Sequence, residues 1–258
     1  MTRSNKLRAD ILTVERGLAD SRARAQALIL GGKVYSGERR IEKPGETLRA
    51  DAPLTLRTPD HPWVSRGGIK LAHALEHFGI DPQGMTTLDI GASSGGFTDV
   101  LLAHGASKVY AVDVGSGQLA WRLRNDKRVV VLEKTNARHL TREQIPEPID
   151  MIVCDASFIG LKTILAAPIA LARQTAILVA LIKPQFEVGR GQVGRGGVVR
   201  DPALHRAVLE SVVQLALDRN WGLGGVCASA LRGAEGNQEF FVHLVPGSRG
   251  LDASRSAQ

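Results

Sequence analysis

Four ionisable residues stand beside predicted helices and strands at widely separated points of the chain: Lys70, Asp155, Lys183 and Glu239. Lys70 lies one turn into a predicted helix, Asp155 follows the apolar run MIVC, Lys183 follows AILVALI, and Glu239 opens the last predicted strand. Because the carboxyl ends of parallel strands meet at one edge of a sheet, we expect these side chains to converge there. Two lysines and two carboxylates in one place can remove a proton from a hydroxyl without a metal ion or a covalent intermediate.

The chemistry of a lysine base limits how such a site can be built. A lysine accepts a proton only when its pKa lies well below the ordinary value of about 10.4, and a second ammonium nearby lowers it by repulsion between like charges. Two lysines with two carboxylates therefore make physical sense as one site. Taken alone, each of the four residues is also consistent with a solvated charge at the end of a helix or strand.

The segment LDIGASSGGFTDVLL, residues 88–102, predicts an apolar strand that runs through a turn of small residues into a helix. Such turns hold nucleotide-like cofactors, because a ligand can approach the backbone and the helix start offers free N–H groups. Asp113 ends the next strand, 22 residues after Gly91, which is the offset of a carboxylate that accepts both hydroxyls of a ribose. Ser93 occupies the second glycine position of G-x-G-x-x-G, and dehydrogenases use a similar turn, so this signal alone is weak.

The residues predicted to bind a cofactor lie in and around this turn. Asp89 either contacts the amino acid part of a cofactor or braces the glycine turn from below. Asn136 follows the third strand, where it could border an adenine, and Asp113 could also be a plain solvated carboxylate. The complete predicted set is Asp89, Gly91, Ser93, Gly95, Gly96, Phe97, Asp113, Asn136 and Asp155.

The elements that must position these residues alternate between helix and apolar strand, which is the pattern of a parallel sheet covered on both faces. The predicted helices span residues 67–78, 97–104, 119–124, 161–172 and 202–219. The predicted strands span residues 87–90, 108–112, 129–132, 150–154, 176–182, 226–231 and 239–245. The fold class is therefore α/β, a Rossmann-like sheet with helices on both faces.

A small α+β unit precedes this sheet. Helices over residues 8–16 and 21–30 lead into a strand, a turn at Ser36-Gly37, a second strand and a closing strand over 54–56. Residues 1–60 carry twelve Lys and Arg against eight Asp and Glu, whereas the other 198 residues carry 21 against 18. Since clustered cations gain affinity by releasing phosphate counterions, we expect this unit to dock on a polyanion.

Length and composition limit the domain organisation and the location of this protein, which has 258 residues and a formal net charge of +7. We predict four segments: residues 1–57, a linker over 58–64, residues 65–248 and a tail over 249–258. Cys154 and Cys227 lie in apolar runs rather than at metal-ligand spacing, which favours buried thiols in a reducing compartment and argues against a zinc site. No segment has the length of a signal peptide or a membrane span, so we expect a cytoplasmic protein.

Five motifs, taken in chain order, resemble those of the FtsJ-like ribose 2'-O-methyltransferases. They are S-R-x-x-x-K-L from Ser65, D-I-G-A-x-x-G-G-F from Asp89, C-D-A-S-F from Cys154, K-P-Q-F-E from Lys183 and N-Q-E-F-F from Asn237. The run RADILTVERGLADSRARAQALILGGKV near the N-terminus resembles the S4 RNA-binding module. The pairing of the two resembles the TlyA family over nearly the whole chain.

The resemblance implies that the family's catalytic tetrad falls on Lys70, Asp155, Lys183 and Glu239. It also implies S-adenosylmethionine as methyl donor and a ribose 2'-hydroxyl of ribosomal RNA, which we expect to be a cytidine's, as acceptor. We assign Lys183 as the base, Lys70 as the cation that lowers its pKa and steadies the ribose, and Asp155 as the group that orients Lys183. Glu239 is the hydrogen-bond partner of a lysine or of the target nucleotide.

The residues predicted to contact RNA are Arg8, Arg22, Arg24, Lys33, Arg66 and Arg195, with ribosomal RNA or ribosomal subunits as partners. Residues 189–200, GRGQVGRGGVVR, are rich in glycine and arginine and contain no acid. We predict a mobile loop there that grips phosphate or closes over RNA. Phe158 and Gly160 stand where FtsJ proper has a proline-containing turn, so fine substrate choice does not carry over.

Two other function classes are kept beside this one. Members of the family have carried the label haemolysin, which makes a membrane-active protein one alternative. The other is a non-catalytic RNA-binding protein in ribosome assembly that keeps the cofactor fold as a scaffold. Lysine-dependent methyl transfer would distinguish the enzyme from both.

Overall fold

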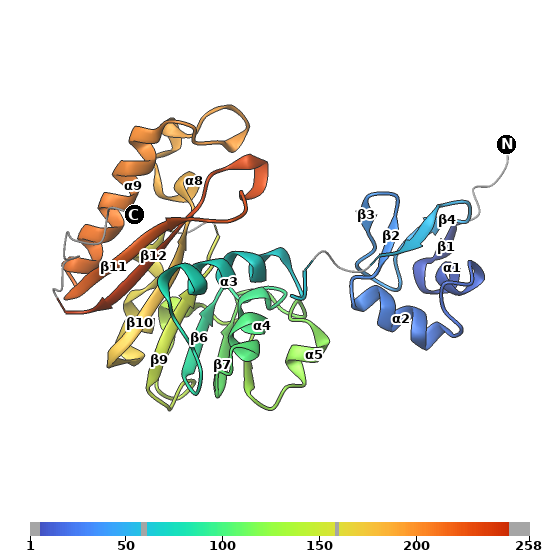
Figure 1. Ribbon diagram of the computed structural model, residues 1–258, viewed down its shortest axis with the longest axis horizontal. Helices are drawn as coiled ribbons and strands as arrows, with labels where there is room; N and C mark the ends of the chain where they lie inside the picture. Colours follow the sequence, from blue (N-terminus) through green and yellow to red (C-terminus); the bar gives the residue numbers. More distant parts are fainter. Residues whose placement is uncertain (1–5, 58–60, 158–159, 248–258) are drawn as a thin grey trace. The chain divides into compact units, whose positions relative to one another are not determined.

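The chain forms two compact units, Met1–Val64 and Ser65–Gln258, each built around its own hydrophobic core (Figure 1). The computed structural model describes residues 6–57, 61–157 and 160–247. Within these ranges, no helix combines the length and the apolar character that crossing a membrane requires.

Unit 1 packs two helices against two small antiparallel sheets. Its elements are β1 (Lys6–Arg8), α1 (Ala9–Glu15), α2 (Arg22–Leu30), β2 (Val34–Ser36), β3 (Arg39–Arg40), β4 (Thr47–Arg49) and β5 (Leu54–Leu56). β1 pairs with β4, and β2 lies between β3 and β5. The hydroxyl of Ser21 accepts a hydrogen bond from the Arg24 N–H at 3.2 Å, so the second predicted helix begins at its expected cap. The small α+β unit is confirmed, with β1 and β4 in addition to the three predicted strands.

Unit 2 is a seven-stranded, mostly parallel sheet in the order β11-β12-β10-β9-β6-β7-β8. The strands are β6 (Thr86–Ile90), β7 (Lys108–Val112), β8 (Val129–Leu132), β9 (Ile149–Cys154), β10 (Ala172–Ile182), β11 (Trp221–Ala228) and β12 (Phe240–Pro246). The helices are α3 (Arg66–Phe78), α4 (Gly96–Ala103), α5 (Trp121–Arg124), α6 (Leu161–Ile164), α7 (Ala166–Leu171), α8 (Pro184–Glu187) and α9 (Pro202–Leu217). Four short 3₁₀ turns complete it: η1 (Ala137–His139), η2 (Arg190–Gln192), η3 (Arg195–Gly197) and η4 (Ala234–Gly236).

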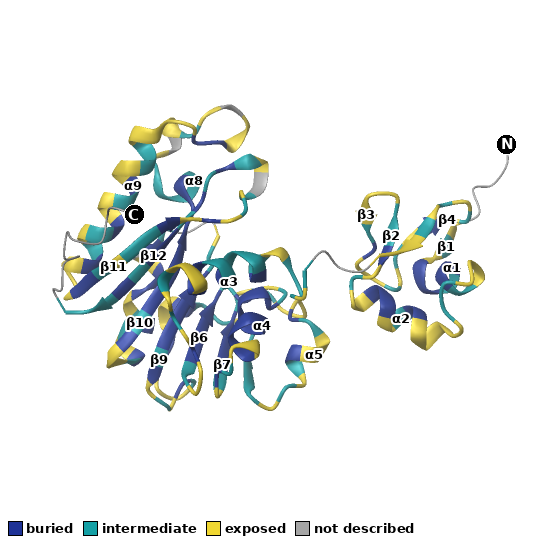
Figure 2. Ribbon diagram, viewed as in Figure 1, coloured by how far each residue is buried: buried dark blue, intermediate teal, exposed yellow. Residues whose placement is uncertain are grey.

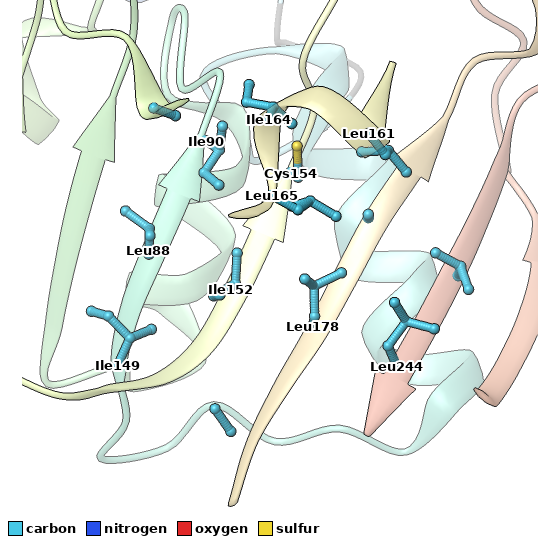
Figure 3. Close-up of a cluster of buried hydrophobic side chains, with 14 of the residues drawn as sticks. Leu88, Ile90, Ile149, Ile152, Cys154, Leu161, Ile164, Leu165, Leu178 and Leu244 are labelled. Atoms are coloured by element: carbon cyan, nitrogen blue, oxygen red, sulfur yellow. The ribbon is translucent and has the colours of Figure 1, made fainter. Parts of the chain in front are cut away.

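Both faces of the sheet are covered, because alternate strand residues point to opposite sides. Leu88 and Ile90 of β6 belong to a core that α6, α7 and α9 close. Figure 3 shows both residues in this cluster with Ile152 of β9. Asp89, between Leu88 and Ile90, points the other way and bonds Thr98 of α4. The central strands are accordingly buried along most of their length (Figure 2). The predicted α/β class with helices on both faces is confirmed.

The order of the strands decides where a ligand can bind. From β6 the chain adds β7 and β8 on one side and then β9 and β10 on the other, so the order reverses between β6 and β9. In open α/β sheets the crevice beyond the carboxyl ends at such a reversal is the usual ligand site.

Three predicted elements are corrected by the structure. The helix predicted over residues 161–172 is two short helices, α6 and α7, and Ala172 already opens β10. The strand predicted over 226–231 is β11, which begins five residues earlier. Glycines 222, 224 and 225 lie in this strand, where the register shifts between Leu223 and Gly225. β12 runs antiparallel to both neighbours, because no helix between β11 and β12 is long enough for a parallel crossover.

Candidate active site

The register between β6 and β9 brings the small-residue turn next to Asp155. Ile90 pairs with Cys154, so Gly91 and Asp155 leave the sheet as neighbours. A Cβ atom on Gly91 would lie 2.8 Å from the main-chain oxygen of Asp155, and Gly91 has a φ of +81°. Only glycine meets both conditions without strain.

The register between β10 and β12 likewise brings Lys183 and Glu239, the other two tetrad residues at strand ends, next to each other. Ile182 pairs with Phe240, so Lys183 and Glu239 leave neighbouring strands at the same level. Lys70 reaches them from the second turn of α3, and its Nζ donates to Oε2 of Glu239 at 2.6 Å. Residues separated by as many as 169 positions in the chain thus meet at one edge of the sheet.

The tetrad consists of two ion pairs rather than four separate charges. In the first, Lys70 and Glu239 are 13% and 3% exposed. In the second, Nζ of Lys183 lies 2.7 Å from Oδ1 of Asp155, and these side chains are 9% and 23% exposed. The Lys70 ammonium was expected to repel that of Lys183, but it is neutralised by its own carboxylate. The predicted contact of Asp155 with Lys183 and that of Glu239 with a lysine are both present.

A pocket of about 350 Å³ opens beside these pairs, beyond the carboxyl ends of β6 and β9. Its walls come from the start of α3, the small-residue turn, Asp155 and the connection between β11 and β12. The lining residues are Ser65, Arg66, Gly67, Lys70, Gly91, Ala92, Ser93, Ser94, Gly96, Phe97, Asp155, Arg232 and Gly233. The predicted cofactor turn and two members of the tetrad therefore share one pocket.

The turn itself has the backbone of a ligand cradle. Ser93 has a φ of +48°, and its N–H donates to Oδ2 of Asp113 at 2.8 Å. Oδ1 of the same carboxylate accepts from the Gly115 N–H at 2.7 Å. Asp113 thus ties the turn after β6 to the loop after β7, and α4 starts at Gly96 with its N-terminal N–H groups at the pocket. A small-residue turn, a strand-end carboxylate and a helix start fit a nucleoside-type cofactor.

Some of the predicted cofactor residues lie outside the pocket lining. Asp89 has no exposed surface, and its Oδ2 accepts from the Thr98 hydroxyl of α4 at 2.6 Å. Burial raises the pKa of Asp89 to about 7. Asn136 caps η1 by accepting from the Arg138 N–H at 3.1 Å. Contacts of Asp89, Asp113 and Asn136 with a cofactor stay predictions.

Close packing of neighbouring elements, as well as cofactor binding, would require glycine at positions 95 and 96. A Cβ atom on Gly96 would lie 2.4 Å from the Ser65 hydroxyl and 2.8 Å from the Gly68 nitrogen, so this glycine lets α3 and α4 approach. One on Gly95 would lie 2.3 Å from Leu123. Phe97 packs against Phe241, with ring centroids 6.1 Å apart.

Several residues of this site escaped the sequence reasoning. The hydroxyl of Ser157 accepts from Nζ of Lys183 at 2.7 Å, and Arg232 and Gly233 line the pocket. Ser157 stands in the motif C-D-A-S-F, so its place beside Asp155 was the available signal. Arg232 and Gly233 precede the last strand, and no local pattern marks them.

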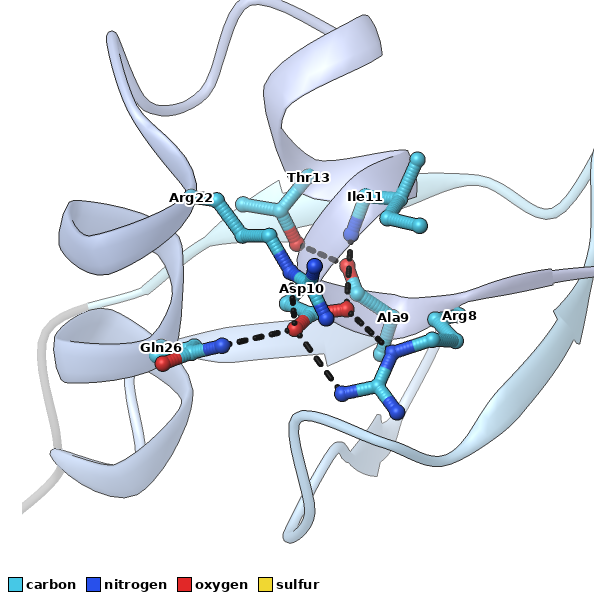
Figure 4. A network of polar contacts seen from close by, with 7 residues as sticks. All are labelled: Arg8, Ala9, Asp10, Ile11, Thr13, Arg22 and Gln26. Atoms are coloured by element: carbon cyan, nitrogen blue, oxygen red, sulfur yellow. Dashed lines mark hydrogen bonds and ion pairs between the residues drawn. The ribbon is translucent and has the colours of Figure 1, made fainter.

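The predicted RNA contacts of unit 1 divide into two groups. Arg8 and Arg22 both bond the carboxylate of Asp10, which has no exposed surface and also accepts from Gln26 (Figure 4). These guanidinium groups hold α1 and α2 together while remaining about half exposed. Arg24 and Lys33 lie exposed on the surface.

Basic residues of unit 1 that were not predicted border an open groove of about 660 Å³. Its lining is Arg39, Arg40, Glu42, Lys43, Gly45 and Glu46. In unit 2, Arg66 lies exposed at the pocket, and Arg195 opens η3 with a side chain outside the described part of the structure. All RNA contacts stay predictions.

Comparison with known proteins agrees with this architecture. Residues 63–245 match the FtsJ-like methyltransferase family, and residues 7–53 match the S4 domain. The chain is 50% identical to the Mycobacterium tuberculosis 16S/23S rRNA (cytidine-2'-O)-methyltransferase TlyA, over 93% of this chain and 90% of that protein. It is 38% identical to Hemolysin A of Brachyspira hyodysenteriae, over 93% of this chain and all of that protein.

Solved structures show the same likeness. A protein from Streptococcus thermophilus that is titled a hemolysin superposes with a TM-score of 0.75 at 40% identity, covering 98% of this chain and 94% of that one. The chain thus combines a methyltransferase fold, an S4 domain and a pocket beside the small-residue turn. S-adenosylmethionine is the cofactor of this enzyme class. The chain belongs to the FtsJ-like methyltransferase family, in the TlyA group whose members join that domain to an S4 domain.

Proposed function

We propose that this chain methylates the 2'-hydroxyl of a cytidine in ribosomal RNA, with Lys183 as the base. The observation that carries the proposal is the double ion pair at the pocket, Lys183 with Asp155 and Lys70 with Glu239. The 50% identical relative is named an rRNA (cytidine-2'-O)-methyltransferase, which supports the acceptor. The S4 domain supports docking on RNA.

The pocket would hold the cofactor through the small-residue turn, with Gly91 allowing close approach and Asp113 available to the ribose hydroxyls. When bound, S-adenosylmethionine supplies an electrophilic methyl group. The residues of this chain must then place one hydroxyl in line with that methyl group and take its proton as the oxygen attacks.

The surroundings of Lys183 hold its amine in one place for that proton transfer. Its Nζ lies near three acceptors: Oδ1 of Asp155 and the hydroxyl of Ser157, both at 2.7 Å, and the main-chain oxygen of Asp155 at 3.4 Å. An ammonium has three protons and no acceptor site, so the base form must release one of these contacts. The 3.4 Å contact is the longest, so we expect the amine to release this one and turn its lone pair to the acceptor hydroxyl, while Asp155 and Ser157 keep Nζ in place.

Lys70 and Glu239 serve the acceptor side of the same site. Lys70 lines the pocket, so its ammonium can bond a ribose oxygen, and Glu239 fixes its position from a nearly buried site. The two ion pairs together carry no net charge, which limits the cost of holding four ionised groups out of water.

The test is methyl transfer to unmodified ribosomal subunits. Purified protein, labelled S-adenosylmethionine and separate small and large subunits should give label on ribose, located by mass spectrometry of nucleosides. Lys183→Ala should abolish transfer while the cofactor Kd, measured by calorimetry, changes little. Lys127→Ala, at an exposed lysine, is the matched control and should behave like the wild type. Label on a base, or full activity in Lys183→Ala, would overturn the mechanism.

The same preparation separates the two alternative functions. A non-catalytic assembly factor would bind ribosomal RNA without consuming S-adenosylmethionine. A membrane-active protein, as the name of the Brachyspira relative suggests, would release dye from liposomes at physiological salt. Neither result is expected.

A further inference from the structure

The side chain of Asn237 joins two parts of unit 2 that are far apart in the sequence. Asn237 is 2% exposed. Its Oδ1 accepts from the Val199 N–H at 3.0 Å, and its Nδ2 donates to the main-chain oxygen of Gly197 at 2.9 Å. One amide therefore meets both a donor and an acceptor of the backbone at the end of the glycine-rich segment, residues 189–200.

That end of the segment is held firmly. Val198 and Val199 are 7% and 2% exposed, and the Gly194 N–H donates to the main-chain oxygen of Val198 at 3.1 Å. The main-chain oxygen of Val199 also lies 3.0 Å from Nε2 of His205 on α9. We predicted a mobile loop over residues 189–200, whereas Val198 and Val199 near its end are buried and bonded.

The other side of Asn237 leads to the tetrad. Its main-chain oxygen accepts from the Gly233 N–H at 2.9 Å, which closes the connection between β11 and β12. Gly233 lies against Glu239, since a Cβ atom on Gly233 would be 2.0 Å from Oε1 of that carboxylate. The main-chain oxygen of Glu239 accepts from Ser229 at 2.8 Å, and its Oε2 accepts from Lys70.

We propose that Asn237 is a positioning residue for methyl transfer, which locks the end of the glycine-rich segment to the connection that holds Glu239 and so sets the place of the Lys70 ammonium. The hydrogen bonds described for Asn237 go to the backbone of Gly197, Val199 and Gly233. Asn237 acts through Gly233 and Glu239, and it makes residues 197–199 part of the same rigid unit as the acceptor side of the pocket. The proposal rests on the proposed function and adds a residue to it.

Asn237→Asp is the sharpest substitution. An aspartate keeps an oxygen for the Val199 N–H, but it has no proton for the main-chain oxygen of Gly197, so two acceptors would face each other. Gly233→Ala is a second variant, because its methyl group would displace the Glu239 carboxylate without touching the glycine-rich segment. Asp201→Ala is the matched control: it removes the N-cap of α9, just after the same segment, and loosens the fold locally.

The expected result is a split between turnover and cofactor binding. In Asn237→Asp and Gly233→Ala, kcat at saturating RNA should fall about 10- to 100-fold, because small misplacements of positioned groups carry costs of that size. In Asn237→Asp the Kd for S-adenosylmethionine should stay within about threefold, since the turn at residues 91–96 is on other elements; Gly233 lines the pocket, so Gly233→Ala is judged on kcat alone. Asp201→Ala should lower Tm but leave both quantities near the wild-type values.

Amide hydrogen exchange gives a readout that does not depend on activity. In Asn237→Asp, repulsion between the carboxylate and the main-chain oxygen of Gly197 should push residues 197–199 away, so the Val199 amide should lose protection; in Gly233→Ala it should keep it. If the wild type transfers no methyl group to RNA, the proposed function fails, whatever the variants do. If the wild type is active and Asn237→Asp matches its kcat, or loses cofactor affinity in proportion to kcat, the positioning role is overturned.

Discussion

Nζ of Lys183, at the end of β10, lies 2.7 Å from Oδ1 of Asp155, at the end of the neighbouring strand β9. Both residues directly follow buried apolar strands, so the sheet holds their backbones rigidly and the pair needs little further ordering. A base and the carboxylate that orients it are thus supplied by adjacent strands, and the Lys70–Glu239 pair completes the site from α3 and β12.

Replacing Asp155 by asparagine tests this relationship. The amide keeps the shape of the side chain but removes the charge that holds the Lys183 ammonium. We expect kcat for methyl transfer to fall about 100-fold, as for other positioned groups, and Tm to fall as well, because the nearly buried Lys183 ammonium loses its counter-charge. Steady-state kinetics and thermal unfolding measure the two effects. Unchanged kcat would show that Asp155 does not orient the base.

Gly91→Ala should disable the cofactor turn. The substitution places a methyl group 2.8 Å from the Asp155 main-chain oxygen and forces a φ of +81° on alanine. The control is Gly84→Ala, where φ is +74° but no atom lies within 4 Å of the added carbon. The strain shared by both variants costs about 1 to 2 kcal/mol of unfolding free energy, and the clash adds to this only at Gly91.

Two measurements separate these variants. Denaturant unfolding should show a larger loss for Gly91→Ala than for Gly84→Ala, and calorimetry should show weakened S-adenosylmethionine binding in Gly91→Ala alone. Equal behaviour of the two variants would mean that the approach of Gly91 to Asp155 has no part in the pocket.

Asp10 should control the stability of unit 1. Its buried carboxylate accepts from Arg8, Arg22 and Gln26, and these partners hold its pKa well below the usual range. A lowered pKa in the folded state adds stability that is complete above the unfolded pKa of about 4 and is lost as the pH falls through the folded value. Asp10→Asn should therefore cost about 1 to 3 kcal/mol at pH 7, and the difference from the wild type should shrink in acid.

Amide exchange within residues 6–57 of the whole chain, at pH 7 and at lower pH, tests this expectation. Asp51→Asn is the control, because the ion pair of Asp51 with Arg49 is exposed on both sides and should contribute little. A pH-independent difference between Asp10→Asn and the wild type would contradict the assignment. RNA binding by Asp10→Asn should weaken as well, since Arg8 and Arg22 lose their common anchor.

Asp89 should destabilise the protein at alkaline pH. Burial raises its pKa to about 7, so its favourable contribution is complete below the unfolded pKa of about 4 and is lost as the pH rises through 7. Asp89→Asn, which resembles the protonated acid, should be more stable than the wild type at pH 8 and should lose that advantage near pH 4. Denaturant midpoints at both pH values measure the difference.

The same variant addresses the two interpretations of Asp89. If the residue only braces α4 through Thr98, the Kd for S-adenosylmethionine should be unchanged in Asp89→Asn. A large rise in Kd would indicate direct contact with the amino acid part of the cofactor.

The local sequence was sufficient to predict features that depend on residues close together in the chain. The apolar runs before Asp155 and Lys183 predicted buried strands, the turn from Gly91 to Gly96 predicted a cofactor loop, and the motifs predicted the family. Element boundaries failed where tertiary pairing overrode composition. β11 continues through three glycines because β12 hydrogen-bonds along it, and no local propensity reports that partner.

Tertiary structure alone decided the partner of Glu239. The sequence analysis predicted that Asp155 orients Lys183, but it left open whether Glu239 bonds a lysine or the target nucleotide. The antiparallel register of β12 answers this, because it sets Glu239 where Lys70 reaches it from α3 and leaves Asp155 to Lys183. The hydrogen bonds of the Asn237 side chain with Gly197 and Val199 likewise depend on the tertiary structure. Contacts between distant segments depend on register and packing, which a pattern of residue types does not contain.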